Sequence, residues 1–302
     1  MTEKQTAAAA HTGTRRTTEI EEITNLYLIH PLASRLVPMF ARLHITPNAV
    51  SIVGMLFGIL SAFAYYRYWD PGFAITGFAL MVAWHVMDGA DGQLARYTQS
   101  YSYLGKMLDG IADNVTFAAV YASIAVAASR RHGDWVYALI VISAVFHAIQ
   151  SASYETERQE YEYLGWGKKP QEPPPRTGVD GGASGLRRLL DFLHRLFYFG
   201  LSFPTAETNR KFRGTMAQAL QTDPGQDVRV RQLYRETIAP QIRGWSILSA
   251  NYRTLGIFIA SLFKAPEYYF GFEILGFSVV LAVLIRRLKI AHEVLVSKLR
   301  LA

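Results

Sequence analysis

Four aspartates lie close together where one apolar segment of the chain ends and the next begins. Asp88 and Asp91 are three residues apart, and Asp109 and Asp113 are four residues apart. On helices, these spacings place each pair on one face, one turn apart. If the two helices face each other, four carboxylates meet in one pocket. Such a pocket needs a cation, because carboxylates held together without one raise each other's pKa values.

The residue types around the aspartates narrow the kind of cation. The cluster contains no His, and the chain contains no Cys, so oxygen ligation of Mg²⁺, Mn²⁺ or Ca²⁺ is favoured over zinc. The absence of Cys also excludes disulfides, Cys-ligated zinc or iron–sulfur centres and a thiol nucleophile. The spacing does not fit an EF-hand loop. The small residues Gly92, Ala95 and Gly105 leave room for a bulky ligand, and Arg96 and Lys106 are the nearest positive charges in sequence.

The elements that must position these residues are membrane-spanning helices. Half of the 302 residues are hydrophobic and only 18% are charged, against about 25% in soluble domains. A span needs about 20 apolar residues, and six segments are candidates, so we predict an all-α polytopic membrane protein. The second segment reaches that length only if Asp88 and Asp91 are also helical. The candidates are Asn48–Tyr66, Phe73–Met87, Met107–Ser129, Trp135–Tyr154, Ile247–Phe263 and Tyr268–Ile285.

The distribution of basic residues predicts the orientation. About 26 of the 31 Lys and Arg flank the spans on the side of both termini, and Arg67, Arg130, Arg131 and Lys264 lie in the opposite loops. The positive-inside rule therefore places both termini and the aspartates on the cytoplasmic side, in the inner or cytoplasmic membrane. The net charge of +7 has the same origin, so we expect no nucleic acid partner. Residues 1–18 lack the apolar core of a cleavable signal peptide.

We expect four regions along the chain. Residues 1–47 form a cytoplasmic tail and an interfacial amphipathic helix (Glu19–Leu43), residues 48–154 hold spans one to four, residues 155–246 form a cytoplasmic insertion, and residues 247–302 hold the last two spans and a tail. Within the insertion, the Pro- and Gly-rich run 168–185 predicts a linker, and Leu186–Phe203 predicts either a second interfacial helix or part of a small soluble subdomain. The Glu-rich start of the insertion predicts a solvated helix that continues from the fourth span.

The aspartate region also resembles a known signature. Residues 88–113 match D-x-x-D-G-x-x-A-R-x8-G-x3-D-x3-D, the signature of the CDP-alcohol phosphotransferase family, at every fixed position. Thr46-Pro47-Asn48 with Ser51 is similar to the T-P-N-x-x-[TS] entrance to the first span of that family. The resemblance covers a small part of the chain, but eight fixed residues make it specific.

The resemblance implies a reaction in which an alcohol oxygen attacks a phosphorus of a CDP-linked donor and CMP leaves. It implies two divalent ions, Mg²⁺ or Mn²⁺, held by Asp88, Asp91, Asp109 and Asp113, with Asp113 also the general base. Such a reaction needs charge neutralisation on the pyrophosphate and a group that takes the alcohol proton. The resemblance places the CDP donor against the remaining matched positions, which are Asn48, Ser51, Gly92, Ala95, Arg96 and Gly105.

The substrates are less defined by the sequence. We expect CDP-diacylglycerol as donor and a polar alcohol as acceptor, in a homodimer embedded in a lipid bilayer. Asn114 stands where family members that accept phosphorylated alcohols often have a basic residue. This disfavours a phosphorylated acceptor, although Lys106 and Arg253 could contact a phosphate. The alternatives are a CDP-linked head group with a lipid alcohol as acceptor or, in another class, a cation transporter or an inactive scaffold.

Overall fold

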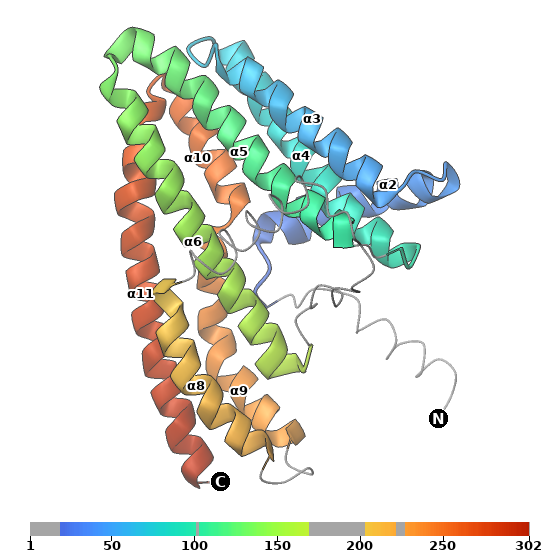
Figure 1. The fold of residues 1–302 in the computed structure, drawn as a ribbon, viewed down its shortest axis with the longest axis vertical. Coiled ribbons are helices and arrows are strands. Elements are labelled where there is room, and N and C mark those ends of the chain that lie inside the picture. The colour runs from blue at the N-terminus through green and yellow to red at the C-terminus, as the bar shows by residue number, and fades with distance from the viewer. Residues whose placement is uncertain (1–18, 101–102, 169–202, 222–226, 302) are drawn as a thin grey trace, which may run out of the picture.

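The computed structural model describes residues 19–100, 103–168, 203–221 and 227–301, and every regular element in these ranges is helical (Figure 1). The predicted all-α fold is therefore confirmed. The elements are η1 (Asn25–Ile29), α2 (His30–Arg42), α3 (Pro47–Tyr65), α4 (Pro71–Tyr97), α5 (Tyr103–His132), α6 (Trp135–Trp166), α8 (Phe203–Gln221), α9 (Asp227–Ile242), η3 (Arg243–Leu248), α10 (Ala250–Leu262) and α11 (Pro266–Leu301).

Five helices are long and apolar enough to cross a membrane: α3, α4, α5, α6 and α11. Each overlaps one of the six predicted spans. α4 runs through both Asp88 and Asp91, as its predicted length required. α3 and α4 begin with proline at the first helical position, where its missing N–H costs nothing. The preceding Thr46 and Asp70 cap the two helices by accepting hydrogen bonds from Ala49 N and Gly72 N.

The predicted fifth span, Ile247–Phe263, differs from the other five. Its first residues belong to the 3₁₀ helix η3, Ser249 is extended, and α10 then has only 13 residues. At a rise of about 1.5 Å per residue, α10 is about 20 Å long, shorter than a hydrocarbon core of about 30 Å. α10 packs against α4 and α11. Its polar residues Asn251, Arg253 and Thr254 are all buried.

Three short connections between helices lie at one end of the molecule, at the top of Figure 1. They are the turns after α3, after α5 and before α11. These turns, with the ends of the helices that they join, hold the four basic residues predicted to face away from the cytoplasm, Arg67, Arg130, Arg131 and Lys264. The four residues are therefore at one end of the bundle, as the orientation argument required.

α6 and α11 extend beyond the other end of the bundle. With 32 and 36 residues they are about 48 and 54 Å long, more than a bilayer core needs. Their distal parts pack with α8 and α9 into a second helical unit, seen at the bottom of Figure 1. Its buried core includes Tyr161, Phe212, Tyr234 and Leu288. The predicted linker 168–185, apart from Lys168, and the predicted helix Leu186–Phe203, apart from Phe203, lie outside the described residues.

The insertion begins as predicted, with a helix that continues from the fourth span, but two of its acids are not solvated. Glu157 and Glu160 are only 2% and 3% exposed. Glu157 accepts a hydrogen bond of 2.6 Å from Asn209, and Arg213 pairs with Glu160. Packing of α8 against α6 therefore buries these carboxylates, which the sequence pattern of α6 alone could not indicate.

The predicted amphipathic segment Glu19–Leu43 is helical from residue 23 and forms η1 and α2. α2 buries Ala33, Val37 and Phe40 against α4, while Met39 stays exposed. Its buried face therefore supports the helix that carries Asp88 and Asp91.

Candidate functional site

The candidate site is built on α3, which packs against both α4 and α5. α3 runs antiparallel to α4, and Gly54 allows the close approach: a Cβ at Gly54 would stand 3.0 Å from Cβ of Met87. One turn nearer the start of α3, the Ser51 hydroxyl donates a hydrogen bond to Asp91 Oδ2. Ser51 and Asp91 are both buried, with exposed fractions of 7% and 5%. A residue expected on the donor surface thus orients one of the predicted metal ligands.

The contact between α3 and α5 is closer still. A Cβ at Gly58 would lie 2.2 Å from Oγ1 of Thr116, so only glycine fits. Further along, the Ser123 hydroxyl donates to the carbonyl of Ala62. The order of these contacts shows that α3 and α5 run parallel. Small residues at helix interfaces permit this kind of approach in membrane proteins.

The register of α4 on α5 follows from an aromatic contact. The rings of Trp84 and Phe117 meet edge to face, 5.5 Å between centroids. Because α4 and α5 are antiparallel, one turn onward from Trp84 and one turn back from Phe117 reach the same level of the bundle. Those residues are Asp88 and Asp113, both half-buried. The structure therefore brings the two predicted aspartates to one level of two neighbouring helices.

The next turn of α4 carries the predicted nucleotide surface. Asp91, Gly92, Ala95 and Arg96 follow in one continuous helix. A Cβ at Gly92 would meet only the guanidinium of Arg96 within 4 Å, with Nη1 at 3.5 Å. No other part of the described chain packs within that distance, so packing does not require a glycine at this position. A position without a side chain beside a guanidinium is suited to an anionic ligand.

Three predicted site residues, Gly105, Lys106 and Asp109, lie in α5, but the side chains of residues 103–111 are outside the described part. Among the described side chains, no group of three His, Asp or Glu is placed to hold a metal ion. The predicted set of four metal-binding aspartates includes Asp109, which the backbone of α5 places one turn before Asp113. The carboxylates of Asp88, Asp91 and Asp113 are the oxygen donors that Mg²⁺ and Mn²⁺ prefer, so the donor chemistry fits these ions.

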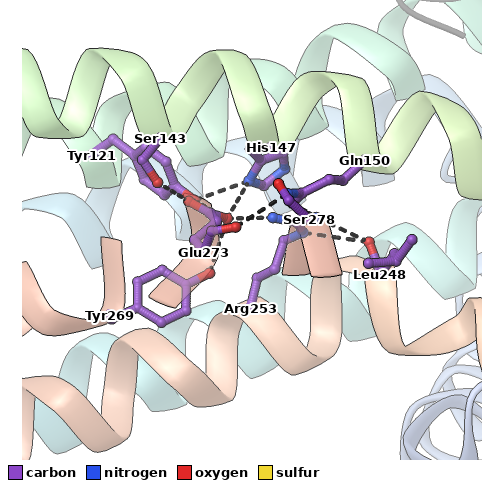
Figure 2. A network of polar contacts seen from close by, with 9 residues as sticks. All are labelled: Tyr121, Ser143, His147, Gln150, Leu248, Arg253, Tyr269, Glu273 and Ser278. Carbon is purple, nitrogen blue, oxygen red and sulfur yellow. Dashed lines mark hydrogen bonds and ion pairs between the residues drawn. The ribbon is translucent and has the colours of Figure 1, made fainter. Parts of the chain in front are cut away.

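Of the remaining predicted residues, Asn48 is half-buried in the first turn of α3, where the entrance motif places it. Arg253 of α10 is fully buried. Its guanidinium pairs with Glu273 of α11 and lies 3.0 Å from Gln150 Oε1 and 3.3 Å from the carbonyl of Leu248 (Figure 2). In this structure its polar contacts are therefore to other helices of the bundle.

Glu273 is the centre of this polar network, and the sequence analysis did not identify it. Its carboxylate accepts hydrogen bonds from Tyr121 at 2.7 Å, Tyr269 at 3.0 Å and Ser143, and lies 3.3 Å from His147 (Figure 2). A buried acid in an apolar helix is costly unless it is paired, and this cost is the signal that could have identified it. The network joins α5, α6, α10 and α11.

Among the described residues, one side-chain hydrogen bond joins α10 to α4. Thr254, next to Arg253, places Oγ1 2.9 Å from Nε2 of His85. His85 lies one turn before Asp88. No pattern in the sequence indicated Thr254 as the partner of His85.

Comparison with known proteins agrees with the signature. Residues 44–171 match the model of the CDP-alcohol phosphatidyltransferase family. Over 118 residues the chain is 29% identical to the bifunctional IPC transferase and DIPP synthase of Aquifex aeolicus (strain VF5), a match covering 39% of this chain and 26% of that protein. The chain therefore spans about a quarter of the length of this relative. The match of residues 44–171 includes all the signature aspartates, so this part of the chain is similar to the CDP-alcohol phosphatidyltransferase family.

Proposed function

We propose that this protein is a metal-dependent phosphotransferase of phospholipid biosynthesis, which transfers a phosphatidyl group from CDP-diacylglycerol to a polar alcohol and releases CMP. The observation that supports it most is the position of Asp88 and Asp113 at one level of α4 and α5, inside the domain that matches the family. The buried hydrogen bond from Ser51 to Asp91 adds the orientation expected of a metal-binding carboxylate.

The proposed roles follow the chemistry of a phosphoryl displacement. Asp88, Asp91, Asp109 and Asp113 would hold two divalent ions, Mg²⁺ or Mn²⁺, which neutralise the charge of the pyrophosphate. Asp113 takes the proton of the acceptor hydroxyl as its oxygen attacks the phosphorus of the phosphatidyl group. The bond from that phosphorus to the bridging oxygen breaks, and CMP leaves with the bonding electrons.

The nucleotide part of the donor is assigned to the surface of α4 beside α3. Gly92 and Ala95 leave space, and the guanidinium of Arg96 beside Gly92 provides positive charge for a phosphate. Gly105 and Asn48 would complete this surface. Ser51 acts on the same surface through Asp91, which it holds by a hydrogen bond.

For the acceptor, we propose a small neutral or zwitterionic alcohol such as serine or inositol. Asn114 is exposed and uncharged at the position after Asp113, so it offers no positive charge for an acceptor phosphate. Lys106 remains a proposed contact for such a phosphate. Arg253 would need to exchange its pairing with Glu273 to act in this way.

We further propose that the active site and both termini face the cytoplasm, in the inner or cytoplasmic membrane, and that the protein is a homodimer. The grouping of Arg67, Arg130, Arg131 and Lys264 at the opposite end supports the orientation. The dimer rests on the resemblance to the family, and the mass of the purified protein in detergent would test it.

The decisive experiment is CMP release by the purified protein in detergent with Mg²⁺ and CDP-diacylglycerol. The acceptors are serine, inositol, inositol phosphate, glycerol phosphate, choline and ethanolamine. We expect acceptor-dependent CMP release with one of them and its loss in excess EDTA. Activity that persists in EDTA contradicts the metal assignment. If no acceptor works, CDP-linked head groups with a lipid alcohol are tested next, and failure of both pairings overturns the proposed function.

A further inference from the structure

The polar network around Glu273 fixes the position of α10. Arg253 and Glu273 are both fully buried. Their described polar partners lie on α5, α6 and α11 and in η3, which directly precedes α10. Gln150 of α6 contacts Arg253 at 3.0 Å, and its Nε2 also donates to the carbonyl of Glu273 at 3.1 Å. α10 is therefore attached by directional bonds to α6 and α11, and through Glu273 to Tyr121 of α5 (Figure 2).

One residue beyond Arg253, this fixed helix contacts the helix of the aspartates. Thr254 and His85 are 2% and 7% exposed, and the 2.9 Å hydrogen bond between them is buried. The His85 ring also lies against Trp84, 4.3 Å between centroids. Trp84 is the residue that contacts Phe117 of α5. His85 is therefore held from α10 on one side and lies next to the contact that sets the register of α4 on α5.

The position of His85 makes this hydrogen bond relevant to the site. His85 and Asp88 are three residues apart in an uninterrupted helix, so they lie on one face. A rotation or shift of α4 at His85 is therefore transmitted to Asp88 and, a turn later, to Asp91. Metal binding is sensitive to such shifts, because carboxylate ligands must hold their geometry closely.

We propose that Thr254 and His85 are positioning residues, which transmit the fixed position of α10 to Asp88 and so set the metal affinity of the site. The inference rests on the proposed function, in which Asp88 is a metal ligand. It assigns the network around Glu273 a role in preorganising the site, although neither Thr254 nor His85 touches the substrate or the metal.

The matched control is an apolar contact between the same two helices. Phe78 of α4 and Phe258 of α10 stack with centroids 4.2 Å apart. Phe258→Leu reduces packing between α4 and α10 without altering the polar contact. Thr254→Val removes the hydroxyl at nearly constant volume, and Thr254→Ser keeps it. If Thr254→Val does not fold, His85→Phe removes the same hydrogen bond from the other side.

The test has two readouts in detergent. The first is binding of Mn²⁺ without substrates, followed by loss of the free Mn²⁺ signal in electron paramagnetic resonance. The second is the Mg²⁺ concentration at half-maximal CMP release. We expect Thr254→Val to weaken both about tenfold, the lower end of the effect seen for side chains that support metal ligands. Thr254→Ser should match the wild type, and Phe258→Leu should lower the melting temperature without changing either metal constant.

Unchanged metal constants in Thr254→Val, with an active wild type, would overturn the inference. An equal loss in Phe258→Leu would also overturn it, because packing alone would then explain the effect. If the wild type binds Mn²⁺ but releases no CMP with any substrate pair, the proposed function fails, while the binding readout still decides whether Thr254 positions the metal site.

Discussion

In the proposed mechanism, Asp113 is the residue whose chemical role differs most from that of its neighbours, because it alone takes a proton. We expect Asp113→Asn to lower CMP release at least about a hundredfold, because an amide cannot take the acceptor proton. Binding of the CDP donor, measured by calorimetry, should remain. The matched control is Asp134→Asn, the same change at an exposed aspartate at the opposite end of the bundle. Full activity in Asp113→Asn would remove this residue as the base.

Ser51 gives a second prediction at the residue scale. Its hydroxyl donates to Asp91 and to no other described carboxylate, so Ser51→Ala leaves Asp91 less well oriented. We expect the Mg²⁺ concentration at half-maximal activity to rise about 10- to 100-fold, with little change in the maximal rate. Ser34→Ala is the control, because this exposed serine bonds only to the carbonyl of Pro31 in the described structure. An unchanged Mg²⁺ requirement would show that Asp91 does not depend on Ser51.

At the scale of elements, the close approach of α3 and α5 fixes the position of Asp113 along the axis of the helix bundle. Gly58→Ala would place Cβ 2.2 Å from Thr116, so the helices must separate. We expect a loss of about 1–3 kcal/mol, as for overpacked cores, seen as a lower melting temperature in detergent. Gly214→Ala in α8 is the control, because nothing lies within 4 Å of its added Cβ. Equal melting temperatures of Gly58→Ala and the wild type would contradict the packing argument.

The sequence predicted the spanning helices to within a few residues at most ends, because long apolar runs are local signals. It also predicted the aspartates on helical faces. It did not predict the shortness of α10, since Ile247–Phe263 is apolar enough to resemble a span while Ser249 interrupts it. The partners of Glu273 lie on four helices, and no spacing along the chain joins Tyr121 to Glu273. Burial of Glu157 likewise depends on Asn209 of α8, which is distant in sequence.

At the scale of the whole molecule, two helices join the membrane part to the second helical unit. α6 and α11 pass without interruption from the spans into the unit that contains α8 and α9. The same two helices carry Gln150 and Glu273, which hold Arg253. The position of α10 therefore depends on helices that continue into the second helical unit. Because the apolar core of that unit includes Phe277 and Leu281 of α11, the two parts share one continuous packing surface.

The absence of Cys from the chain makes the proposed orientation directly testable, because single cysteines can be introduced without removing any. Asp134→Cys reports on the turn between α5 and α6, and Gln232→Cys reports on α9 in the second helical unit. Both positions are exposed. With the active site on the cytoplasmic side, a membrane-impermeant maleimide added to intact cells should label Asp134→Cys alone. After permeabilisation it should label both. Labelling of Gln232→Cys in intact cells would contradict the proposed orientation, because α9 would then face the outside of the cell.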